Sequence, residues 1–107
     1  MPKYLVQTAY TSESWATMTN APQDRLEAVR PAIEGLGGKL EIGFLAFGEY
    51  DLVAVADFPD NVSAAAFSMS VAAKGGVKAF KTTPLMTMDE AVAAMQKAGG
   101  STYAPPK

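Results

Sequence analysis

Histidine and cysteine are both absent from this chain of 107 residues. Their absence excludes disulfide bonds, zinc fingers, cysteine-ligated clusters and histidine-ligated haem. It also excludes a Ser-His-Asp or Cys-His relay built from this chain alone. An excess of basic charge is lacking as well, because nine basic and eleven acidic residues give a formal net charge of −2. The sequence therefore has no electrostatic footprint for nucleic acid or for an anionic membrane surface.

Long hydrophobic runs are the next absence. The longest uncharged run, Asn61–Ala73, is too short and too rich in serine to cross a bilayer, which needs about 20 mainly apolar residues. The first ten residues lack the apolar segment and cleavage site of a signal peptide. We therefore expect no membrane partner and a cytoplasmic location.

The residues that are present favour a globular domain. Hydrophobic residues make up 49% of the chain and charged residues 19%, a balance with enough apolar surface to offset the entropy of folding. The length suits one domain. We predict a single domain over residues 1–100, followed by a loose C-terminal tail over residues 101–107, after Gly99-Gly100.

Hydrophobic periodicity divides the chain into strands and helices. Alternating apolar residues predict strands, and spacings of three and four predict helices. The expected strands are 3–10, 39–47, 50–58 and 77–83, and the expected helices are 13–19, 22–36, 61–74 and 88–98. The order predicts an α+β, ferredoxin-like βαββαβ fold, with an antiparallel sheet, helices on one face and an additional C-terminal helix.

Several local signals refine these elements. Asn20 is the expected cap of the second helix, and Pro31 is expected to kink or break it. Pro84 is expected to end the fourth strand, because proline cannot donate to the ladder. Thr87 and Glu90 have the spacing of a capping box at the start of the last helix.

The central hairpin is apolar on both faces. Gly48-Glu49 is expected to join its strands in a tight turn. Strict alternation places four residues on one face of the first strand, namely Leu40, Ile42, Phe44 and Ala46. An antiparallel sheet with one wet face should be polar on that face, so something must cover it. We predict a homo-oligomer in which two sheets pair as a dimeric α/β barrel.

The hairpin motif Phe47-Gly48-Glu49-Tyr50-Asp51 resembles the signature of the GYD domain family. Four further blocks match in the same order, namely 3–7, 35–41, 60–65 and 81–85. The resemblance covers about Lys3 to Lys97 and implies a ferredoxin-like, dimeric α/β-barrel fold in small stand-alone bacterial proteins. It implies no activity. Pro31 and the polar residues around Trp15 depart from the family pattern.

The same hairpin is similar to the ligand-binding domain of leucine-responsive transcription regulators. There a G-x-x-D hairpin lies at a subunit boundary that binds small effectors. This chain lacks the helix-turn-helix half of such proteins. Only the possibility of effector binding carries over, at Gly48 and Asp51.

Six residues are candidates for a ligand-binding or interface site: Gly48, Tyr50, Asp51, Trp15, Tyr10 and Phe47. Each also has a structural interpretation. Gly48 could supply a positive φ in the turn, Asp51 could bond to backbone N–H groups and pin the hairpin, and Tyr50 could be a packing residue. Trp15, Tyr4 and Tyr10, with Phe44 and Phe47 nearby, could line a pocket or form part of the core.

Three hypotheses of function follow. The preferred one is a homo-oligomeric binding or interaction module with a possible small-molecule ligand and no cofactor or metal. The second is an enzyme of the dimeric α/β-barrel type, which requires an enclosed pocket beside Asp51 and Trp15. The third is a sensor that binds an effector at a subunit boundary near Gly48 and Asp51. The sequence assigns no catalytic residue.

Overall fold

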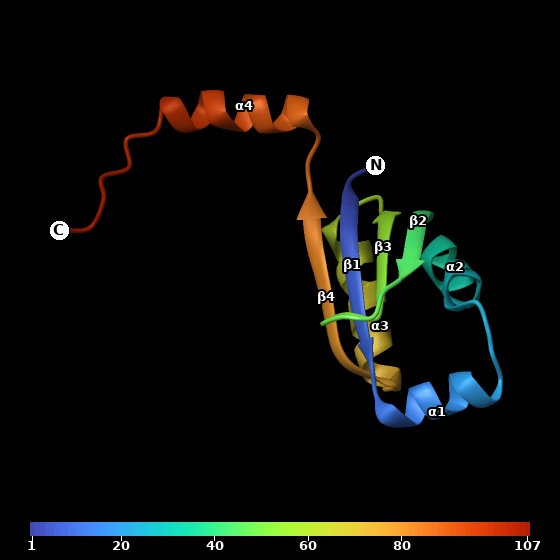
Figure 1. Cartoon of the computed structure of the whole chain (residues 1–107). Coiled ribbons are helices and arrows are strands. Elements are labelled where there is room, and N and C mark those ends of the chain that lie inside the picture. Colours follow the sequence, from blue (N-terminus) through green and yellow to red (C-terminus); the bar gives the residue numbers. More distant parts are fainter.

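The computed structural model describes residues 1–107 as four strands and four helices (Figure 1). The strands are β1 (Lys3–Tyr10), β2 (Lys39–Leu45), β3 (Leu52–Asp57) and β4 (Val77–Leu85). The helices are α1 (Ser12–Asn20), α2 (Arg25–Gly35), α3 (Asn61–Lys74) and α4 (Met88–Gly99).

The strands form one sheet in the order β2-β3-β1-β4, and all neighbours are antiparallel. Each crossover skips one strand, so β3 lies between β1 and β2 and β1 lies between β3 and β4. Helices α2 and α3 both cover the same face of this sheet (Figure 1). The prediction of an α+β, ferredoxin-like fold is confirmed.

A small aromatic cluster forms the core between the sheet and the helices. Phe58 is fully buried, and its ring lies 5.8 Å from that of Tyr4 and 5.7 Å from that of Phe67. Ile33 of α2 and Ala64 of α3 pack into the same cluster. Only 14 of the 107 residues are buried, so this single chain hides far less apolar surface than its composition offers.

A β-bulge in β2 overturns the predicted alternation of that strand. Leu40 pairs with Ala56 and Ile42 pairs with Val55, so two steps along β2 correspond to one step along β3. The extra residue turns the strand over. Leu40 is therefore buried against the helices, while Ile42 and Phe44 lie on the opposite face.

Three further local predictions are corrected. The cap of α2 is Asp24 rather than Asn20, because its carboxylate accepts the N–H groups of Leu26 and Glu27. Pro31 does not break α2, which continues through this exposed position to Gly35. Pro84 lies inside β4, which pairs only with β1, so its missing N–H belongs to the unpaired outer edge.

Helix α4 stands clear of the rest of the molecule, beyond the end of β4 (Figure 1). The capping box of Thr87 and Glu90 begins it as predicted, but none of its residues is buried. The radius of gyration is 17.0 Å, against about 13 Å for a compact chain of this length. Residues 101–107 continue away from the body without a helix or strand. None of the helices has both the length and the apolar character to traverse a bilayer.

Candidate functional site

The loop between β2 and β3 carries four of the candidate residues. It covers residues 46–51 and is longer than the tight turn expected from Gly48-Glu49. Gly48 has no positive φ, and a Cβ built on it would meet no atom within 4 Å. The prediction that this glycine supplies a left-handed turn is therefore wrong. Phe47 beside it is 99% exposed, and the side chain of Tyr50 is half-buried.

Asp51 fastens this loop to the end of β1. Its carboxylate Oδ2 accepts the backbone N–H of Tyr10 at 2.9 Å. Its own N–H donates to the carbonyl of Thr8 at 2.8 Å, and its carbonyl accepts the N–H of Ala46 at 2.7 Å. Two of these bonds hold the loop against β1, which the carboxylate reaches across 41 positions of sequence, and the third lies within the loop. The sequence predicted that the Asp51 carboxylate bonds to backbone N–H groups of its own turn, whereas in the structure it bonds to β1.

Tyr10 and Trp15 meet edge to face, with ring centroids 5.6 Å apart. Tyr10 lines a cavity of about 690 Å³ between the sheet and helices α1, α2 and α3, whereas Trp15 lines an adjoining hollow of about 310 Å³ between α1 and the start of α2. Tyr4 belongs to the closed core instead, and its hydroxyl donates to Asn61 Oδ1 at 2.6 Å. Phe44 and Phe47 line neither space.

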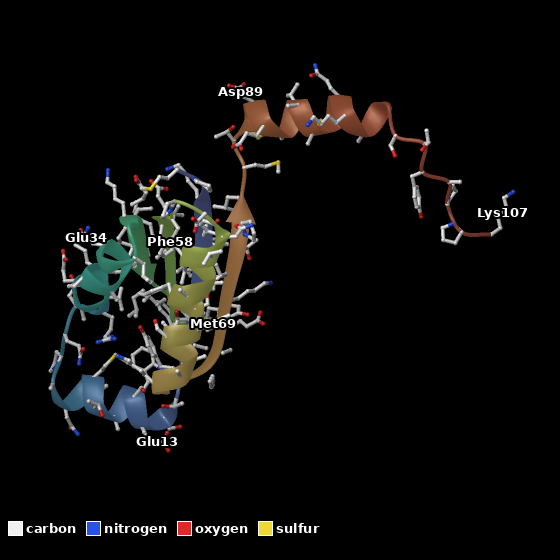
Figure 2. All side chains as sticks on the ribbon, turned by 180° about the vertical axis from the view of Figure 1, so that it is seen from behind. Glu13, Glu34, Phe58, Met69, Asp89 and Lys107 are labelled. Carbon is white, nitrogen blue, oxygen red and sulfur yellow. The ribbon has the colours of Figure 1, made fainter.

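The larger cavity is an open groove on the helical side of the sheet. Figure 2 shows the molecule from this side, with α2 and α3 in front of the strands. Of its 27 lining residues 16 are hydrophobic. Sequence reasoning missed Thr8 and Arg25, which both line it. Alternation along β1 puts Thr8 on the same face as Tyr10, so the available signal was a hydroxyl group at a core-facing position.

The enzyme hypothesis requires an enclosed pocket beside Asp51 and Trp15, and the larger cavity does not provide one. Neither Asp51 nor Trp15 lines the larger cavity, and this cavity is open rather than enclosed. No group of three or more acidic side chains is placed to hold a metal ion.

One ion pair lies at the opposite end of β1 from Tyr10. Lys3 Nζ is 3.0 Å from Asp57 Oδ1, and the carboxylate side chain is only 10% exposed. Burial by itself would raise the pKa of Asp57, but the hydrogen bond and charge of Lys3, with a contribution from Glu41, lower it below its usual value. The hydrogen bond to Asp57 raises the pKa of Lys3 in turn.

The sheet face opposite the helices carries an uncovered apolar patch. Register places Ile42, Val55 and Leu5 side by side across three strands, and Phe44 and Val53 in the next row. Phe44 is 63% and Ile42 is 53% exposed. We call these five residues the open apolar face. The rows end on β4 with Thr83 and Lys81, so this patch is centred on β2, β3 and β1.

The comparisons with known proteins agree with the resemblance seen in the hairpin motif. The family model described as GYD domain matches residues 4–95. Neither a search of curated proteins nor a search of solved structures finds a match to this chain. The matched range covers most of the sequence, including the first two thirds of α4 and every strand apart from Lys3. The chain therefore belongs to the GYD domain family.

Proposed function

We propose that this protein is a homo-oligomeric interaction module in which the open apolar face of one copy packs against that of a second copy. The observation that carries the proposal is the exposure of Phe44 and Ile42 on the edge strand β2, on a sheet face that no helix covers. Contiguous apolar patches of this kind on a small protein mark association surfaces. Two such sheets packed face to face form a dimeric α/β barrel.

The total surface area supports a second copy as the partner. The chain exposes 7354 Å², whereas a compact monomer of 11.2 kDa exposes about 5,700 Å². The excess is about 1,650 Å² per chain. A standard interface hides about 800 Å² per partner, and obligate dimers hide more. Part of this excess belongs to α4 and residues 101–107, which stand clear of the body (Figure 1), so a second copy that covers both α4 and the open apolar face would hide an area typical of a permanent dimer.

Helix α4 gives a second reason to expect a partner. An isolated helix of 12 residues is marginal in water, and this one makes no close packing with its own body. Its apolar stripe includes Met88, Val92 and Met95, which are 76%, 51% and 66% exposed. A neighbouring copy that covers this stripe would stabilise the helix. Phe47, at 99% exposure, would be covered in the same assembly.

The test is the molar mass of the purified chain by size-exclusion chromatography with light scattering. We expect at least twice the chain mass of 11.2 kDa at micromolar concentration. Phe44→Lys should weaken association, because each of two symmetric copies loses the burial of a phenyl ring and places a charge in an apolar surface. A loss of about 2–4 kcal/mol corresponds to roughly a 30- to 700-fold rise in Kd.

The matched control is Met69→Lys. This residue is 69% exposed on α3, on the outer surface of the helical layer (Figure 2). The substitution replaces a large apolar side chain by the same charge, but outside the proposed interface, so the molar mass should not change. A monomeric wild-type chain, or equal effects of the two substitutions, would contradict the proposal.

A further inference from the structure

The groove between α2 and α3 has an apolar body. Its floor consists of small side chains on the sheet, including Val6, Ala54 and Ala56. Leu26 and Val29 of α2 line the groove, and so do five residues on the side of α3 and β4, namely Phe67, Ser70, Val71, Lys74 and Phe80. The volume of about 690 Å³ lies within the range of small-molecule pockets.

The hydroxyl groups of two buried residues lie at the α1 end of this groove. Thr8 and Tyr10 are only 5% and 7% exposed; the Thr8 hydroxyl bonds to no protein atom, and the Tyr10 hydroxyl interacts only with the side chain of Arg25. Tyr4 on the same face of β1 is the contrast, because its hydroxyl bonds to Asn61. No side-chain polar atom sealed from solvent lacks a partner, so the Thr8 hydroxyl opens onto solvent, and both residues line the groove.

A guanidinium group faces these hydroxyls. Arg25, the first residue of α2, lines the groove and donates one hydrogen bond to Gln23 Oε1 at 2.8 Å. No carboxylate lies within ion-pair distance of it. The guanidinium acts on the Tyr10 hydroxyl through a side-chain hydrogen bond and through its charge. Burial, the larger effect, raises the pKa of Tyr10, and Arg25 partly offsets that rise, so the tyrosine remains a protonated donor.

Several donors therefore line an otherwise apolar space. The guanidinium of Arg25 and the O–H groups of Thr8 and Tyr10 all can donate, and Lys74 adds a second positive charge from the α3 side. Glu13 of α1 is the one acidic residue that lines the groove. Two cations against one carboxylate favour a singly charged anion in this space.

We propose that the groove binds a small monocarboxylate with an apolar body, whose carboxylate lies at Arg25 and Tyr10 and whose hydrocarbon part lies between α2 and α3. The ligand supplies acceptors for the Thr8 hydroxyl, for the O–H hydrogen of Tyr10 and for the remaining N–H groups of Arg25, and it covers apolar floor and wall residues that are otherwise in contact with water. A neutral ligand would leave the guanidinium without a counter-charge.

The experiment titrates the full chain with 3-phenylpropanoate and with its neutral amide, followed by NMR chemical-shift changes. We expect millimolar or tighter binding of the acid, with shifts around Thr8, Arg25 and Val71, and at least tenfold weaker binding of the amide. Arg25→Gln should weaken binding of the acid at least tenfold and bring the two affinities together. Tyr10→Phe should weaken binding of the acid severalfold.

Arg30→Gln is the matched control, because Arg30 is on the same helix, bonds to Glu27 and does not line the groove. It should leave both affinities unchanged. Val71→Trp, which fills the groove from α3, should remove binding of both compounds. Thermal denaturation of each variant establishes that it is folded.

Three results would overturn the proposal: no binding of the acid up to 10 mM, equal affinity for the acid and the amide, or equal effects of Arg25→Gln and Arg30→Gln. If α4 of another copy occupies the groove, the acid will not bind. The outcome is independent of the proposed oligomer. A monomer that binds the acid contradicts only the oligomer, and a dimer that does not bind it contradicts only the ligand site.

Discussion

Replacing Asp51 by alanine should destabilise the protein through the junction of the β2–β3 loop with β1. The substitution removes the acceptor of the Tyr10 backbone N–H, which lies at 2.9 Å from the carboxylate in a residue that is only 7% exposed. The two backbone bonds of residue 51, to Thr8 and Ala46, can remain. The loss is that of one hydrogen bond to a charged acceptor, about 1.5–3 kcal/mol.

The Asp51→Asn variant tests how much of this stabilisation depends on the negative charge of the acceptor. An amide oxygen can occupy the place of the carboxylate oxygen and accept the same N–H group, so about half of the loss should be recovered. Glu49→Ala is the control, because Glu49 is an exposed residue of the same loop with no hydrogen bond or ion pair from its side chain. Its effect should lie within about 0.5 kcal/mol of zero.

The assay is urea denaturation followed by circular dichroism, with all variants at one protein concentration because association shifts apparent stability. A stability of Asp51→Ala within 0.5 kcal/mol of the wild type would refute the structural role of the carboxylate. If that variant had also lost a ligand-induced rise in Tm, Asp51 would be a ligand contact, as the sensor hypothesis holds.

Two further predictions concern packing and pH. Gly38→Ala should lower the free energy of unfolding by about 1–3 kcal/mol or more in the same denaturation assay. The reason is that its Cβ would lie 2.5 Å from the carbonyl oxygen of Asp57 and 2.9 Å from Phe58. Gly48→Ala is the control, because its Cβ would meet no atom; it should be neutral or slightly stabilising, and equal effects of the two substitutions would show that the close approach at Gly38 is wrong. Because the folded-state pKa of Asp57 lies below its usual 3.8, its pairing with Lys3 should stabilise the fold fully above pH 3.8 and lose that effect as pH falls through the lowered pKa. Unfolding free energies of wild type and Asp57→Asn from pH 2 to 7 should therefore differ by a constant amount at high pH and converge below 3.8; a constant difference at every pH would rule this out.

The topology could be predicted because its determinants are local. Periodicity placed each strand and helix, and caps such as Asp60 and the Thr87–Glu90 box set where α3 and α4 begin. The βαββαβ order then leaves few arrangements, and the observed strand order is among them. Simple alternation along β1 is sufficient to put Tyr4, Val6, Thr8 and Tyr10 on one face, and all four are buried.

The details that could not be predicted depend on contacts between distant residues. The bulge between Leu40 and Ile42 is a property of the pairing of β2 with β3 and has no signal in the sequence of β2 alone. The bond from Tyr10 to Asp51 joins residues 41 positions apart. The position of Arg25 in the groove depends on the path of the segment between α1 and α2, where Asp24 rather than Asn20 begins the helix.

The six candidate residues do not line one common space. For Tyr10 and Trp15 the sequence left a pocket and a core interpretation open, and each lines one of two adjoining spaces. The hairpin residues Gly48, Asp51 and Phe47 line neither. The motif that identifies the family and the groove that offers unpaired donors are thus different regions, which meet where Asp51 holds the backbone of Tyr10.

The most direct test of the central claim is an isotope-filtered NMR experiment on a mixture of ¹³C-labelled and unlabelled chains, which detects contacts between copies only. We expect intermolecular contacts from the Phe44 ring and from the methyl groups of Ile42, Val53 and Val55, and none from Met69 on the outer surface of α3. Intermolecular contacts confined to the helical side, or none at a concentration where light scattering gives the monomer mass, would contradict that claim.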